Sequence, residues 1–216
     1  PVSQTTIGAP PTTSLAPGAV DVYGTLQYNN NGVTLGVQQG LVRVRNGGVI
    51  NSSSGAITDE TISFQANLGG ATLRVDAGGS ATIEDLALAA AATNFHYLTG
   101  SGTLSITDDI LLGADGGTLT NNRTASFTVA DELSFNAANS AFVNNGILTV
   151  SDDVIASSND FSLTNNLTLT ISDDIILNAS DGNIINNGTM DIPDDLNFNG
   201  DNNTVTNNSD LDMGDI

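Results

Sequence analysis

One tripeptide, an aliphatic residue or methionine, then any residue, then aspartate, returns along the chain at nearly constant spacing. The steps between its copies are 26, 23, 23, 21, 21, 21 and 21 residues. A period slightly above twenty, with strand-like sequence between the copies, is typical of a β-solenoid. The aspartates of the motif are Asp59, Asp85, Asp108, Asp131, Asp152, Asp173, Asp194 and Asp215.

Each period contains three short apolar runs separated by polar corners. Three strands in 21–23 residues predict an all-β fold, a right-handed parallel β-helix. Alternate residues share one face of a strand, so Leu169, Ile171, Ile175 and Leu177 are expected inside the coil. Asp173 is in phase with them. Because a buried carboxylate is costly, we place the motif aspartate at a bend, where it accepts backbone N–H groups.

The two ends of the chain differ in composition. Residues 1–20 hold four of the five prolines and are predicted to be an extended segment outside the repeat. The solenoid is predicted over residues 21–216, with irregular coils to about residue 102 and regular coils over 103–216. The repeat restarts at Asp215 without a capping helix, so we expect an open strand edge that can template another chain.

A second motif, an Asn–Asn pair, keeps the same register as the aspartates. Stacked coils would bring the first Asn of each pair to about 4.8 Å from the next, where each amide can donate to one neighbour and accept from the other. The pattern predicts an internal asparagine ladder, with the second Asn facing out. Its members are Asn121, Asn144, Asn165, Asn186 and Asn207.

Acidic residues also follow the motif aspartates, and together they form the best candidate for a metal site. Stacked charges about 4.8 Å apart repel by roughly 1 kcal/mol in water, so something must offset them. One answer is Ca²⁺, which binds carboxylate and carbonyl oxygens; the other is N–H bonding with screening by monovalent salt. No GGxGxD or DxDxDG signature is present. The candidate ligands are Asp109, Glu132, Asp153, Asp174 and Asp195.

The charge balance restricts the partners. The net charge is −20, with four arginines, no lysine and no cysteine. Nucleic acids and anionic membranes attract Lys and Arg, so neither is an expected partner. No apolar run reaches the length of a membrane-spanning helix. We expect the four arginines to pair with Asp or Asn at the surface.

The competing hypothesis is an enzyme, because polysaccharide-cleaving enzymes also use right-handed β-helices with paired aspartates. Against it, the acidic pair recurs in every coil, whereas a catalytic site is a singular feature. A lyase also needs a base such as Arg or Lys and cationic side chains to hold uronates, and this chain has only four arginines and no lysine. The lone histidine, His96, lies in what reads as a loop-like insertion, and we expect a packing or surface role for it.

Sequons for N-glycosylation accompany the Asn pairs. Three of them lie at the second Asn, where an outward column is expected, and would be good acceptors in a source that glycosylates surface proteins. These candidates are Asn122, Asn166 and Asn187.

The repeated LTISDDIIL and NNG units over roughly residues 50–216 resemble the extracellular β-strand-repeat proteins of prokaryotes. These include autotransporter passengers, filamentous-haemagglutinin-like adhesins and β-solenoid filament subunits. The resemblance implies an extracellular or cell-surface protein. With an open edge, we expect a non-enzymatic subunit that stacks head to tail with itself into a filament or sheath. The alternative is one segment of a large adhesin passenger that binds glycans or other cell-surface ligands.

Overall fold

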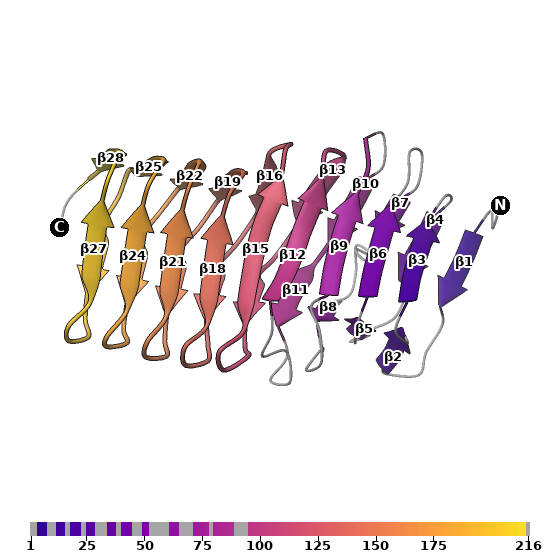
Figure 1. The fold of residues 1–216 in the computed structure, drawn as a ribbon, viewed down its shortest axis with the longest axis horizontal. Coiled ribbons are helices and arrows are strands. Elements are labelled where there is room, and N and C mark those ends of the chain that lie inside the picture. Colours follow the sequence, from indigo (N-terminus) through magenta and orange to yellow (C-terminus); the bar gives the residue numbers. More distant parts are fainter. Residues whose placement is uncertain are drawn as a thin grey trace.

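Three parallel β-sheets run side by side along one long axis in the computed structural model of this chain (Figure 1). The structure describes the backbone of strands β1–β8 and of residues 71–77, 80–88 and 95–214, and the side chains of residues 72–77, 81–88 and 95–214. No helix occurs in this part of the chain. Each coil adds one strand to each sheet, so strands paired in a sheet are three apart in sequence order.

The first sheet, sheet A, has ten strands. It contains β1 (Gln4–Ile7), β4 (Thr25–Tyr28), β7 (Val49–Asn51), β10 (Ser80–Ile83), β13 (Thr103–Ile106), β16 (Phe127–Val129), β19 (Ile147–Val150), β22 (Thr168–Ile171), β25 (Thr189–Ile192) and β28 (Asp210–Met213).

The second sheet, sheet B, has nine strands. It contains β2 (Thr12–Leu15), β5 (Thr34–Val37), β8 (Thr61–Phe64), β11 (Asp85–Leu88), β14 (Ile110–Leu112), β17 (Leu133–Phe135), β20 (Val154–Ala156), β23 (Ile175–Leu177) and β26 (Leu196–Phe198).

The third sheet, sheet C, also has nine strands. It contains β3 (Gly18–Val22), β6 (Gly40–Val44), β9 (Ala71–Val75), β12 (Phe95–Gly100), β15 (Thr118–Arg123), β18 (Ala141–Asn144), β21 (Ser162–Asn165), β24 (Asn183–Asn186) and β27 (Thr204–Asn207).

The register of sheet C confirms the coil length read from the sequence. Ala141 pairs with Ser162, which pairs with Asn183, so each coil there advances by 21 residues. Between Thr118 and Ala141 the advance is 23 residues. The core lies between the three sheets, where one aliphatic or aromatic side chain stacks on the next, as Phe142, Leu163 and Ile184 do.

The predicted boundary at residue 20 is wrong. Strands β1, β2 and β3 lie within or across residues 1–20 and pair in parallel with β4, β5 and β6. The segment therefore belongs to the repeat, although its four prolines themselves lie outside the described residues.

The loop predicted around His96 is also a strand. His96 lies in β12 and is fully buried, in register with Leu119 of the next coil. It occupies a core position and takes the packing role that was expected. The NFHYL sequence looked irregular because a polar residue, His96, takes an inward-facing position. Even so, the side chains of β12 alternate between the two faces of the sheet, as in the neighbouring strands.

A column of left-handed residues turns the chain between sheets B and C. The φ angles are 72° at Gly116, 54° at Asn139, 59° at Asp160, 61° at Asp181 and 58° at Asn202. Glycine, asparagine and aspartate are the residues that adopt this conformation most readily. This column was not predicted, although its steps of 23, 21, 21 and 21 residues are present in the sequence.

Candidate functional site: two asparagine ladders and an acid column

The predicted internal ladder is present, and we call it the inner asparagine ladder. The Nδ2 of each member donates to the Oδ1 of the next, at 2.7 Å from Asn121 to Asn144 and 2.9 Å at each later step, to Asn207. The first four members are fully buried. A buried amide is tolerated because its donors and acceptor are satisfied.

Each inner Asn also turns the corner from sheet C to sheet A. The Oδ1 of Asn144 accepts the N–H of Gly146 at 3.2 Å, two residues on. Its Nδ2 additionally donates to the carbonyl of Thr168 in the next coil at 2.8 Å. Asn165 and Asn186 repeat the donation to the next coil. One side chain thus fixes both a local Asx-type turn and the contact between coils.

The second Asn of each pair builds a further ladder that the sequence analysis did not predict. In this outer asparagine ladder the direction of donation is reversed: Nδ2 of Asn145 donates to Oδ1 of Asn122 at 2.8 Å, and Asn166 donates to Asn145 at 2.7 Å. Asn187 and Asn208 continue it. The two rows of amide dipoles run antiparallel, so they offset each other. The equal spacing of both Asn residues was the available signal.

The predicted glycosylation acceptors belong to this outer ladder. Asn122, Asn166 and Asn187 are exposed, as an acceptor must be. The Nδ2 atoms of Asn166 and Asn187 each donate one ladder bond, which leaves their second N–H for a glycan. Glycosylation at these positions stays a prediction.

The acid column (Asp109, Glu132, Asp153, Asp174 and Asp195) lies at the corner between sheets A and B. The Oδ1 of Asp153 accepts the backbone N–H of Asp174 at 2.9 Å, and Asp174 accepts that of Asp195 at 2.9 Å. Asp109 accepts the N–H of Glu132 at 3.0 Å. In these bonds the second acid of each pair, rather than the motif aspartate, accepts the N–H groups of the corner. For these three bonds the acceptor lies one residue after the motif aspartate, because the backbone turns between the two strands.

The coil of Asp85 shows the same rule. Its carboxylate accepts the N–H of Asp109 at 3.3 Å, and Leu86 pairs with Ile110 while Ile83 pairs with Ile106. This coil is therefore one residue short at the corner, and Asp85 takes the place of the second acid.

Burial and neighbouring charges raise the pKa values of three acids at this corner. Partial burial, followed by the charges of nearby acids, raises the pKa of Asp109 and of Asp153, while the accepted backbone N–H opposes the shift. A hydrogen bond with Asp131 raises the pKa of Asp152. The column thus holds its charge at a cost at neutral pH.

Three groups of carboxylates gather closely enough to share one cation. In each group the carboxylate oxygens lie within 4.8 Å of one another. The groups are Asp85, Asp108 and Asp109; Asp152, Asp153 and Asp173; and Asp173, Asp174 and Asp194. Among the described residues, the predicted ligands Glu132 and Asp195 belong to none of them. Glu132 instead accepts the hydroxyl of Ser134 at 2.9 Å. Oxygen donors of this kind suit Ca²⁺, and calcium binding stays a prediction.

Arg123 departs from the expected surface pairing. Its guanidinium is buried, donates to the carbonyls of Thr99 at 3.3 Å and Gly102 at 2.6 Å, and lies 5.7 Å from the ring centre of Phe127. Burial lowers its pKa to about 10, so it remains charged at neutral pH. Arg74 does pair at the surface, with Asp76 at 2.6 Å. The side chains of Arg43 and Arg45 lie outside the described residues.

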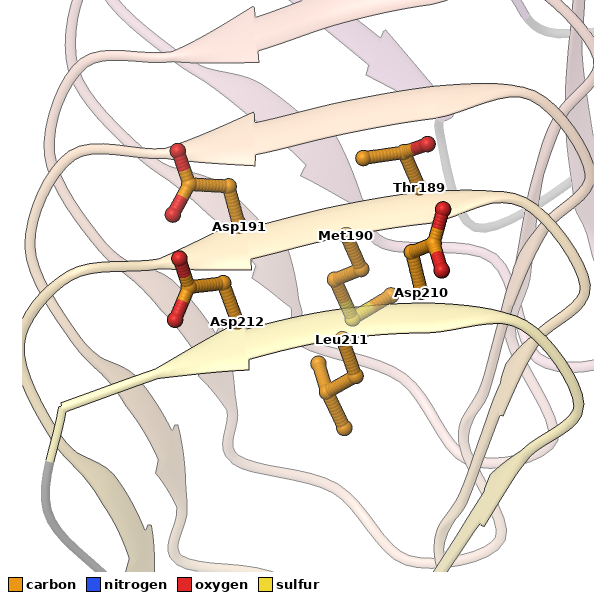
Figure 2. A pocket seen from close by; sticks show the side chains of 6 residues that line it. All are labelled: Thr189, Met190, Asp191, Asp210, Leu211 and Asp212. Atoms are coloured by element: carbon orange, nitrogen blue, oxygen red, sulfur yellow. The ribbon is translucent and has the colours of Figure 1, made fainter.

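A shallow hollow of about 450 Å³ lies on sheet A near the last described coil. Figure 2 shows Asp191 and Asp212 on neighbouring strands, with Thr189 and Asp210 further along them. Met190 and Leu211 project from the opposite face of the same strands. The hollow is acidic and open.

Comparison with protein-family models, curated proteins and solved structures returned no match. Within the described residues, no helix is long and apolar enough to span a membrane.

Proposed function

We propose that this chain is a non-enzymatic, extracellular structural β-solenoid that stacks end to end into a filament or sheath. The neighbour supplies one strand edge for each of the three sheets, and the first coil of another copy is one source of such an edge. The resemblance to prokaryotic β-strand-repeat proteins supports the extracellular placement.

The observation that carries the proposal is the end face, which we define as the surface of β26, β27 and β28. Phe198 is 43% exposed, whereas Leu177, its partner in the preceding coil, is fully buried. Leu211 and Met213 are only partly buried, whereas Met190 and Ile192 are 1% exposed. These side chains belong to columns that every interior coil covers. Another coil on this face would bury them at roughly 25 cal/mol for each Å² of apolar surface.

The repetition of the acids supports a structural role. A catalytic acid–base pair needs two carboxyl groups in different environments with distinct roles. Here Asp153 and Asp174 make the same bond to the next coil, at the same distance. Such equivalence suits a device that sets the coil period.

Electron microscopy of the purified chain tests the proposal. We expect rods longer than one subunit, with an axial repeat that matches the subunit length. The variant Phe198→Lys places a charge on the end face and should abolish the rods. Its matched control, Phe95→Lys, changes a phenylalanine that is 64% exposed on the side of the solenoid and should leave them intact. Monodisperse short particles of the unmodified chain at high concentration would contradict the proposal.

One observation favours the alternative of an adhesin segment. Phe95 and Tyr97 alternate on the outer face of β12, and sugar rings stack on exposed aromatic side chains of this kind. Binding on a glycan array that is lost in Phe95→Ala but retained in Phe198→Lys would support this second function.

A further inference from the structure

The acids of this chain are not spread evenly around the coil. Among the described residues, the motif aspartates and the acid column lie at the corner between sheets A and B. Exposed aspartates also follow the corner between sheets B and C, at Asp115, Asp160 and Asp181. The third corner, between sheets C and A, has no exposed charged side chain from β12 to β25, because its one charged residue, Arg123, is buried. A chain with a net charge of −20 thus keeps one edge neutral.

This neutral edge is also where apolar side chains are exposed. Four large apolar side chains of the described residues are exposed, and two of them lie here: Leu167 at 48% and Ile147 at 41%. The outer asparagine ladder runs beside them. We define the neutral edge by its exposed residues, which are Asn122, Asn145, Ile147, Asn166, Leu167 and Asn187.

Leu167 projects from this edge without a side chain on either side of it in its own column. Ile147 pairs with Thr168, which pairs with Thr189, so the residues in register with Leu167 are Gly146 and Gly188. A leucine between two glycines forms a knob with a side-chain-free position on each side. A second copy of the same edge, turned around, offers both the knob and the positions that receive it. The edge is therefore complementary to itself in shape.

The outer ladder is complementary to itself in chemistry. Each amide has both donor and acceptor groups, and the second N–H of Asn166 is not used in the ladder. Two such ladders have the same axial spacing, about 4.8 Å for each coil, because they are the same structure. When the two copies are antiparallel, their rows of amide dipoles are antiparallel too, and they attract each other. A partner of another kind would have to match this spacing independently.

We infer that two copies of this chain pair side by side through the neutral edge, related by a two-fold axis perpendicular to the solenoid axis. Charge selects this edge, because the acids described at the other two corners of one copy repel those of another. The shared spacing and the self-complementary amides select a second copy as the partner. The contact uses the sides of interior coils, so it goes beyond the proposed end-to-end stacking and does not depend on it.

Side-by-side pairing and glycosylation of this edge exclude each other. A glycan on Asn166 or Asn187 would cover the side chains that form the contact. The pairing therefore concerns the chain without glycans, and an experiment on unmodified protein tests it directly.

Sedimentation velocity over a range of concentrations tests the contact. We expect a dimer, because a two-fold contact closes on itself. Leu167→Glu should weaken it by roughly a hundred-fold, since the symmetry applies each change twice. The matched control, Phe95→Glu, changes a more exposed apolar residue at the opposite end of a sheet C strand and should leave pairing intact. Added salt should tighten the dimer, because it screens the repulsion between two chains of charge −20. Circular dichroism verifies that both variants fold.

Cross-linking locates the contact. The chain has no cysteine, so single substitutions report on one position each. A short bis-maleimide should link Leu167→Cys into dimers at low protein concentration and should leave Phe95→Cys unlinked. Copies that meet only end to end keep the Leu167 positions a subunit length apart, beyond the reach of this reagent.

The outcomes separate this inference from the proposed function. Rods of single width without cross-linked dimers would overturn the inference and leave end-to-end stacking in place. Cross-linked dimers without rods would uphold the inference and overturn end-to-end stacking. Equal association of Leu167→Glu and Phe95→Glu, or a dimer that salt weakens, would overturn the inference. A monomeric chain that binds insoluble cellulose, with binding lost in Leu167→Glu, would assign the neutral edge to a neutral polysaccharide instead.

Discussion

The coil that contains β12 and the coils that contain β18, β21 and β24 turn the same corner in two ways. In β12 the inner position holds Leu98, and the corner residue is Gly100 with φ of +100°. A side chain at Gly100 would collide with the carbonyl of Val75. In the later coils the inner position holds Asn, and among the described residues none at the corner has a positive φ. An amide side chain thus replaces a left-handed backbone at this corner. Two of these coils still have a glycine there, because a side chain at Gly146 or Gly188 would collide with the preceding coil.

Arg123 lies in the coil of Asn121, next to the β12 coil, which has Leu98 in place of an inner Asn. It is in register with Gly100, and its guanidinium reaches back to carbonyls of the coil that has no ladder. In the ladder coils, Asn Nδ2 atoms satisfy carbonyls near the start of the next sheet A strand. In both kinds of coil, the buried carbonyls at the corner between sheets C and A need a hydrogen-bond donor. Either an arginine or an asparagine side chain can provide it.

Asn165→Leu tests the comparison with the largest expected effect, because it puts the residue of the β12 coil into a ladder coil. It removes the bonds to Asn186 and Thr189 and leaves Nδ2 of Asn144 without its ladder acceptor. We expect a loss of about 3 kcal/mol or more in the free energy of unfolding, measured by urea denaturation. The exposed neighbour, Asn166→Ala, should cost less than about 1 kcal/mol. Similar losses in both variants would show that burial does not determine how much an asparagine ladder contributes to the free energy of unfolding.

Arg123→Met tests the hydrogen bonds that Arg123 makes to the preceding coil. The variant keeps an apolar stem but leaves two carbonyls without their donors, so we expect a loss of about 2 kcal/mol. Arg74→Met, at the exposed ion pair, should change stability by less than about 0.5 kcal/mol. An unchanged melting temperature in Arg123→Met would indicate that water replaces the guanidinium.

The acid column responds to pH with a defined sign. Because folding raises the pKa of Asp109 and Asp153, the folded state binds protons more tightly than the unfolded state. This contribution to stability is fully present below the ordinary pKa of 3.8 and is lost as the pH rises through the raised value. Asp153→Asn keeps the Oδ1 acceptor without the charge. We expect it to raise the melting temperature at pH 7 and low salt by a few degrees, and by less near pH 4.

Two further measurements complete this test. Asp153→Ala, which loses the bond to Asp174, should be less stable than Asp153→Asn at both pH values. Calcium, if it binds the carboxylate groups, should release or absorb heat in calorimetry and raise the melting temperature of the unmodified chain more than that of Asp153→Asn. No heat and no shift in melting temperature would dismiss the calcium hypothesis.

The smallest expected effect concerns the other corner, where left-handed residues are retained. Asp160→Gly relieves a left-handed conformation at φ of 59° and should stabilise the fold by about 0.5 kcal/mol, net of the entropy of glycine. Asp160→Val should destabilise it, because a β-branched residue resists a positive φ. Thermal unfolding of the two variants provides the comparison, and a more stable valine variant would show that the turn can relax.

Much of the coil was readable in the sequence. The period, the three strands per coil and the inner ladder follow from residues that recur every 21 positions, since strand alternation and the spacing between strands are constant. The outer ladder and the left-handed column were equally periodic but carried no hydrophobic contrast, so they did not stand out. The acid that binds the corner N–H could not be chosen by phase, because phase is defined within a strand and is lost where the chain bends.

The sequence by itself determined that this chain forms a β-solenoid with 21–23 residues per regular coil and a buried row of asparagines. Only the tertiary structure decided that residues 1–20 contribute strands to the first coil, that Arg123 is buried, and that the two ladders run in opposite directions. The reason is physical. Periodicity records which side chains share a face, whereas hydrogen-bond direction and the filling of a corner depend on groups brought together from neighbouring coils.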